Sequence, residues 1–564
     1  MTEAQSKDKI RESNHSRNKS KSISEGKSDR LRSRKSNKQL RPSTRDRRNT
    51  VVKPPKERVK RSELEELPIM KTESPSTPPT AWIQNLTTRS HDIGAVPASP
   101  LASPLGAGRL DPFGIYPTEL YQHYGGALPM YVHEVIDHCL NHTSLAFVPS
   151  DDPTDLSMIR RYTMQNVMAD ELSWYTVVLA GVTHLSFVRG EVAIPREKQL
   201  LRLSYKTEAM TKIREELDRN QGKASDRALM AMNALASHGA LDDLDGFTHD
   251  KIQARKGFGS ANDTHYYSLL QTGVEHWSSL VRFVEARGGI KATLPSPGVA
   301  FGIAFHDILA AWRMVQPPKF ESIVDTEEAI KANQHKPDAA AIAYARRLLS
   351  GFSSLMDDRW LYSRLMTRLK HMRCIIVDYE QWQRKSPNLP DIRRIFWLRH
   401  FVLHDLLSLP IVGQRLGGGR TELGYELVRI ACLAFMQLVI YPMAAVNEMP
   451  QKILKSMLPV LDRWTKPSEG KILSQEQPGI FIWALVLAGM LAFEHYETTN
   501  DSHLMDSTAK YFDRVSIKAE KRAWPMVKSI MSTHLWIDSE CDGPGQRAWN
   551  YACLWIAVQD QGEN

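Results

Sequence analysis

The stretch NDTHYYSLLQTGVEHWSSLVRFVEARGGI, residues 262–290, shows most clearly how this chain folds. Its apolar side chains recur every three or four residues, the spacing of one helical face, and polar side chains fill the opposite face. We therefore expect one amphipathic helix of about six turns. Gly288 and Gly289 supply the positive φ that closes such a helix, and Ile290 is expected to fold back onto it. Trp277 is predicted to be buried on the apolar face.

Similar helical patterns continue along the chain, and the alternation typical of strands is nearly absent. The predicted fold class is therefore all-α. Clusters of Gly, Pro and Asp predict the connections, the longest being a flexible loop over about 219–261. The predicted helices are 127–143, 168–188, 199–218, 263–287, 298–313, 338–350, 355–384, 391–409, 421–441, 449–464, 479–497, 504–513, 516–534 and 546–558.

Charge and composition together divide the chain into three parts. Residues 1–61 hold 21 Lys and Arg against 7 Asp and Glu, a net of +14, whereas the other 503 residues hold 52 against 57, a net of −5. The first part has no aromatic residue, so we expect a disordered basic tail. Residues 62–105 are rich in Pro, Ser and Thr and are predicted to be a disordered linker, and residues 106–564 to form the helical body.

The basic tail carries two clusters of cations a few residues apart, the arrangement of a bipartite nuclear-import signal. It predicts import receptors as partners and the nucleus as the location. Two alternatives stay open: nonspecific contact with DNA phosphates, and a solvated tail without an address. The residues concerned are Arg45, Arg47, Arg48, Lys53, Lys56, Arg58, Lys60 and Arg61.

The linker contains four Ser-Pro or Thr-Pro pairs that could accept proline-directed phosphorylation. Phosphate there would place negative charge beside the basic tail. Such pairs are also ordinary linker composition, so regulation at these positions is one of two interpretations. The residues are Ser74, Thr77, Ser99 and Ser103.

Histidine pairs are the first candidates for metal chemistry. His400 and His404 lie one helical turn apart, but the metalloprotease pattern requires Glu after the first His, and Phe401 stands there. We interpret both as polar ends on a packed helix. A second group, His133, His138, Cys139 and His142, lacks a further thiolate or carboxylate at a ligand spacing. No metal site is predicted.

Phosphate-binding and membrane signals are equally weak. The glycine-rich stretches 106–108, 257–259 and 417–420 follow no convincing strand and lack the Lys-Ser or Lys-Thr of a phosphate loop. Asp357 and Asp358 resemble part of a diphosphate-binding motif but also suit the start of a helix. The longest apolar run, 480–493, has 14 residues, too few to span a bilayer. We predict no enzymatic activity, no cofactor and no membrane association.

Six segments, in order, resemble the fungal-specific transcription-factor domain, a helical regulatory region. They are GAGRLDPF (106–113) with Tyr116 and Pro117, residues 276–289, RHFVLHDLLSLP (399–410), residues 422–442, WALVLAG (483–489), and WIDSECD (536–542) with Trp549. The resemblance implies an all-α regulatory domain in a nuclear protein linked to transcription, with transcriptional regulators as partners.

One departure from that family concerns DNA binding. Its members commonly carry a binuclear zinc cluster held by six cysteines, whereas this chain has five cysteines in all, the first at Cys139. Sequence-specific DNA binding is therefore not implied, and an upstream segment that supplies the cysteines stays open. Five cysteines without a Cys-x-x-Cys pair also suit a reducing compartment. The alternative function is a helical interaction scaffold with no direct transcriptional role.

Overall fold

The computed structural model describes residues 130–143, 152–190, 196–239, 258, 264–294, 297–332, 336–355, 360–412, 420–444, 447–466, 477–514 and 523–562. These ranges form helices and contain no strand, so the predicted all-α fold is confirmed for them. The predicted boundaries after residues 61 and 105 lie outside the described residues.

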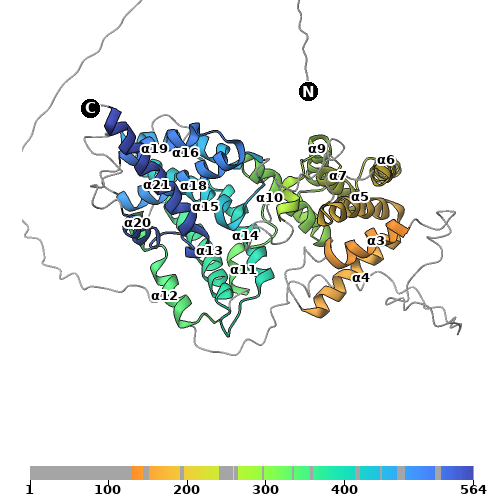
Figure 1. The fold of residues 1–564 in the computed structure, drawn as a ribbon. Helices are drawn as coiled ribbons and strands as arrows, with labels where there is room; N and C mark the ends of the chain where they lie inside the picture. Colours follow the sequence, from red (N-terminus) through yellow and green to blue (C-terminus); the bar gives the residue numbers. More distant parts are fainter. Residues whose placement is uncertain are drawn as a thin grey trace, which may run out of the picture. The chain divides into compact units, whose positions relative to one another are not determined.

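The first described helices pack around α5, which is apolar on nearly all sides. Its neighbours are α3, α4, α6 and α7, and α7 in turn contacts α9 (Figure 1). Asp170 begins α5 by accepting the backbone N–H of Ser173 at 3.1 Å, which satisfies one of the free donors of the first turn. The bounds are α3 (Met130–His138), α4 (Pro153–Ala169), α5 (Glu171–Val188), α6 (Arg196–Arg219), α7 (Asp226–His238), α8 (Thr264–Leu269) and α9 (Val274–Ala286).

The later helices share one large apolar core in which α18 has the most neighbours. It contacts α15, α16, α19, α20 and α21. Two π-helical turns, Cys139–Thr143 after α3 and Met436–Ile440 after α15, complete the helical segments used below. The bounds are α10 (Pro297–Met314), α11 (Thr326–Ala332), α12 (Ala339–Arg347), α13 (Trp360–Gln383), α14 (Ile392–Leu407), α15 (Arg420–Phe435), α16 (Met449–Thr465), α18 (Pro478–Thr499), α19 (His503–Asp513), α20 (Trp524–Met531) and α21 (Asp538–Gly562).

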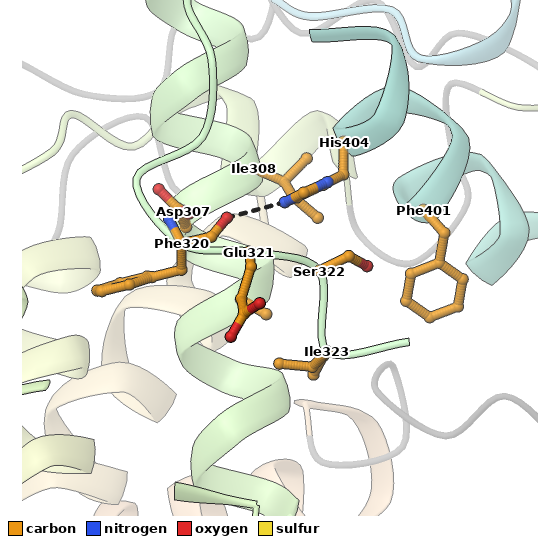
Figure 2. Close-up of a pocket in the computed structure, with 9 residues that line it drawn as sticks. Asp307, Ile308, Phe320, Glu321, Ser322, Ile323, Phe401 and His404 are labelled. Carbon is orange, nitrogen blue, oxygen red and sulfur yellow. Dashed lines mark hydrogen bonds between the residues drawn. The ribbon is translucent and has the colours of Figure 1, made fainter. Parts of the chain in front are cut away.

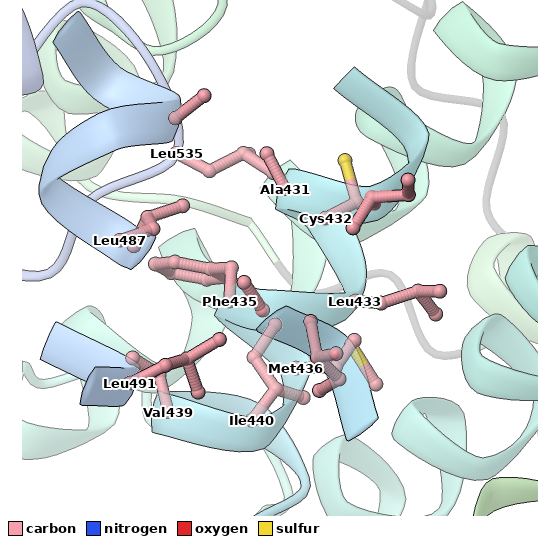
Figure 3. Packing of buried hydrophobic residues seen from close by; sticks show 14 of the residues in the cluster. Ala431, Cys432, Leu433, Phe435, Met436, Val439, Ile440, Leu487, Leu491 and Leu535 are labelled. Carbon is pink, nitrogen blue, oxygen red and sulfur yellow. The ribbon is translucent and has the colours of Figure 1, made fainter. Parts of the chain in front are cut away.

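Close packing between α15 and α18 fills the centre of this core. Phe435 and the π-helical turn after it face Leu487 and Leu491 of α18, and all three side chains are fully buried (Figure 3). Each such leucine contributes about 1.5–3 kcal/mol by leaving water, and truncation to Ala would cost about 2–5 kcal/mol because a cavity remains. The two helices therefore fix the framework on which the polar groups described below are held.

Two segments, Glu422–Ile440 and Pro478–Thr499, are long and apolar enough to cross a membrane by length and composition alone. Their apolar windows are 94% and 78% buried against other parts of the chain. Packing within the fold thus accounts for the apolar surface that the sequence displays in the run 480–493.

The prediction of a single helix over 262–290 is wrong. The chain forms α8 and α9, separated by an extended turn at Gly273, whose N–H donates to the carbonyl of Ala236 on α7 at 2.8 Å. The carbonyl of Ser268, near the end of α8, accepts from the side chain of Asn447 instead of from a following turn. Tertiary hydrogen bonds therefore replace those of a continuous helix, which a periodic pattern does not reveal.

The predicted end of this stretch is confirmed. Gly288 and Gly289 have φ of 105° and 89°, and the N–H of Gly289 bonds back to the carbonyl of Val284 at 2.9 Å. Ile290 is buried in the same cluster as Val284. Trp277, however, is only half-buried, because it lies at the edge of that cluster with its ring 4.8 Å from the ring of His306.

The predicted flexible loop over 219–261 is wrong for Asp226–His238, which form α7. Ser225 accepts the N–H of Ala228 at 3.2 Å and starts the helix, and Leu229 and Leu235 enter the core. The run ALMAMNALAS is rich in Ala, Leu and Met, which favour helices, so its composition was an available signal that the loop prediction missed. The helices α4 and α11 were also not predicted, and α20 begins at Trp524 rather than near 516.

Candidate functional site

The residues predicted for import, DNA contact and phosphorylation all precede residue 130 and lie outside the described residues. Asp357, Asp358 and the glycines of the three glycine-rich stretches also lie outside the described residues. Phe258, within one of those stretches, is described and buried. The structure therefore tests only the candidates in the helical body.

The most elaborate polar group in the described body surrounds Arg399, which is fully buried on α14. Its guanidinium donates to the hydroxyl of Thr264 and the carbonyl of Phe258, and lies 3.4 Å from the carbonyl of Ile440. It also sits 4.8 Å from the ring centroid of Tyr441. We call these five residues the Arg399 junction. It joins α14, the start of α8 and the end of the π-helical turn after α15.

Carbonyl dipoles, a hydroxyl group and the face of an aromatic ring stabilise the positive charge of Arg399. Burial lowers the pKa of Arg399 to about 10, so the side chain remains charged at neutral pH. Desolvation likewise raises the pKa of Tyr441, whose phenol stays protonated. Burying a cation costs free energy unless its N–H groups are hydrogen-bonded, and the guanidinium of Arg399 uses several of its donors at once.

Two further side chains hold Tyr441 in place. Its hydroxyl shares a hydrogen bond of 2.9 Å with Nδ1 of His400, and its carbonyl accepts from Nε1 of Trp312 on α10 at 3.2 Å. Burial and the charge of Arg399 lower the pKa of His400 well below its ordinary value, so this imidazole is neutral. His400 is therefore a hydrogen-bonded polar side chain on a packed helix, as the sequence predicted.

A small pocket lies between α10, α14 and the connection that follows α10 (Figure 2). Asp307 accepts the backbone N–H groups of Lys319 and Phe320 at 3.0 and 2.9 Å. The carbonyl of Phe320 lies 3.0 Å from Nε2 of His404, which must donate because a carbonyl only accepts. The pocket has room for little more than one water molecule, so these groups hold the connection in place and leave no space for an effector.

The second histidine group is packed among helices α3, α5 and α8. Nε2 of His138 lies 2.7 Å from Nδ1 of His184, and the ring of His142 stacks on that of His138 at 4.9 Å. Among the described residues no set of three or more His, Cys, Asp or Glu is placed to hold a metal ion. The sequence singled out His138 and His142 but not their partner His184.

Three of the five cysteines are shielded from solvent, whereas Cys374 and Cys553 are half-buried. Cys139, Cys432 and Cys541 are buried. Desolvation raises the pKa of Cys139 to about 12 and raises those of the other two as well. A thiol with a raised pKa holds little of the reactive thiolate at neutral pH. These residues behave as small apolar side chains of the core.

Sequence reasoning did not find the Arg399 junction. The available signal was a cation inside the apolar run IFWLRHFVL, where a charged residue at the centre of a buried face requires partners. The identity of those partners depends on contacts over more than 100 residues of sequence, such as Arg399 with Thr264.

Comparison with protein-family models, curated proteins and solved structures found no match. The resemblance to a transcription-factor domain thus stays a prediction. Two of the segments quoted for it contact each other, and a third contacts the residue that precedes a fourth. Segment 399–410 meets segment 422–442 at Tyr441, and Trp483 of segment 483–489 donates to the carbonyl of Leu535, next to segment 536–542, at 3.1 Å.

Proposed function

We propose that this protein is a nuclear, transcription-regulator-like protein whose helical body binds other regulators or an effector. The observation that carries the proposal is the charge asymmetry, +14 in residues 1–61 against −5 in the remainder. A tail of that composition is suited to import receptors and phosphates, whereas the acidic balance of the body is suited to protein contacts. The ordered family-like segments support the same assignment.

The body contributes a rigid helical framework to this function. Its polar side chains connect segments that lie far apart in the sequence, at the Arg399 junction and between His404 and Phe320. Such groups position surfaces and do not present an exposed nucleophile or base. The proposal therefore assigns regulation to the binding of partners on the outer faces of the helices, and nonspecific DNA contact to the tail.

Chromatin profiling of the tagged full chain tests the proposal. We expect enrichment at discrete loci, lost when the eight cations of the import segment are replaced. A uniform background in cells where the protein is demonstrably nuclear would count against an association with genes. Affinity purification in the same cells separates the alternative, because a stable complex of cytoplasmic proteins without transcriptional regulators would identify a scaffold.

A further inference from the structure

The first half of α13 presents a face that other described helices leave open. Trp360 is 62% exposed, unusual for the largest apolar side chain, and the guanidinium of Arg364 lies 5.0 Å from its ring centroid. Ser363 and Lys370 are exposed on the same side, and Thr367 lies between them. These five residues, which we call the α13 face, follow one another at helical spacing.

The α13 face is positively charged, and the first five turns of α13 carry no acidic side chain. Residues 360–377 contain Arg364, Arg368, Lys370 and Arg373 but no Asp or Glu. Arg368 pairs with Asp405 of α14 at 3.3 Å, which leaves Arg364, Lys370 and Arg373 without an ion pair to any described residue. The contrast with α11 is sharp, because that helix balances Lys331 against Glu327 at 2.9 Å.

Trp and Arg are the residue types most enriched where protein partners gain their affinity. An exposed indole with a cation over its ring offers an apolar anchor and a charged group side by side. Arg364 and Lys370 are six residues apart, about 9 Å along the helix. This spacing suits carboxylates two turns apart on a second helix packed alongside.

We propose that the α13 face binds an acidic amphipathic helix of a partner protein, with an apolar side chain on Trp360 and carboxylates on Arg364 and Lys370. Charge complementarity favours this occupant over nucleic acid. A face with two or three cations neutralises few phosphates, whereas a peptide helix also supplies the apolar side chain that the exposed ring of Trp360 can contact. A peptide segment needs only the local charge that the face supplies.

The test uses the purified full chain and a fluorescein-labelled synthetic peptide of about 18 residues, five helical turns, with Leu on one face and Glu on the other. Fluorescence anisotropy should show a Kd of about 1–100 μM that weakens as salt is added. Trp360→Ala and the double variant R364E/K370E should each weaken binding at least about tenfold. Circular dichroism should be unchanged, because Trp360 and Lys370 are exposed and Arg364 is only half-buried.

The matched control is R214E/K455E, which changes the charge equally at exposed cations of α6 and α16. It should bind the peptide like the natural protein. Equal binding by all variants, or no binding up to about 1 mM, would overturn the proposal. So would a duplex DNA of similar charge that binds more tightly and depends on the same residues. Because the assay is done in solution, its failure is distinguishable from failure of the proposed nuclear function.

Discussion

Replacing Arg399 by Met gives the sharpest test of how the helical body is held together. The variant removes the hydrogen bonds to Thr264, Phe258 and Ile440 and leaves three buried acceptors. Hydrogen bonds to charged groups contribute about 1.5–3 kcal/mol each, whereas removing a buried charge relieves several kcal/mol of desolvation. The loss exceeds the relief, and we expect a net destabilisation of about 2–4 kcal/mol.

Thermal unfolding followed by circular dichroism measures this effect. For cooperative unfolding of roughly 400 residues, 2–4 kcal/mol corresponds to a fall in Tm of about 2–5 °C. The matched control is Arg384→Met. Arg384 makes two bonds of 3.0 Å to Asp338 and a further ion pair with Glu380, but its side chain is 35% exposed. Solvent screens such pairs, so its Tm should fall by about 1 °C or less.

The ordering of the two variants decides the reasoning. If Arg384→Met lowers Tm more than Arg399→Met, the number of ion pairs matters more than burial. If Arg399→Met leaves Tm unchanged or raises it, the desolvation of the guanidinium outweighs its hydrogen bonds. The Arg399 junction would then be a tolerated cost and not a stabilising connection between α8 and α14.

Three further predictions concern pH, backbone and thiols. Burial lowers the pKa of His238 to about 3, so the unfolded state takes up the proton first and the free energy of unfolding falls as pH drops from about 6.5 towards 3. Between pH 7 and pH 5, thermal unfolding should show that the natural protein loses about 2 kcal/mol more than the variant His238→Asn. Gly289 has φ 89° and ψ 178°, a backbone region open to glycine alone, so Gly289→Ala should lower the free energy of unfolding in urea by about 1–3 kcal/mol. The control Gly298→Ala, in the first turn of α10, should change it by no more than about 0.5 kcal/mol. A thiol reagent at pH 8 should react quickly with at most the two half-buried cysteines, Cys374 and Cys553, in the native protein and with all five after unfolding; rapid labelling of more than two would contradict the burial described.

The helical fold could be predicted because it depends on local spacing. Most of the expected helices exist, since a run such as 480–493 is apolar over a length that suits α18. The closing turn at Gly289 could also be predicted, because only glycine adopts its backbone angles readily. Residues that are neighbours in the sequence determine these features.

The errors arise where distant groups decide the outcome. The break between α8 and α9 depends on Ala236 and Asn447, and neither lies within 262–290. Trp277 is half-buried because the helix places it at the rim of a cluster, which periodicity cannot distinguish from the centre. The Arg399 junction has the same origin, since its acceptors come from three separate segments.

Nuclear import of the full chain tests the central proposal most directly. A fluorescent fusion should be nuclear, and replacing the eight cations from Arg45 to Arg61 by Ala should leave it in the cytoplasm, because a chain of 64.0 kDa enters poorly by diffusion. Adding an unrelated import signal to that variant should restore nuclear fluorescence, which shows that the body still folds. A fusion that stays cytoplasmic with the natural tail, or nuclear without its cations, would contradict the account.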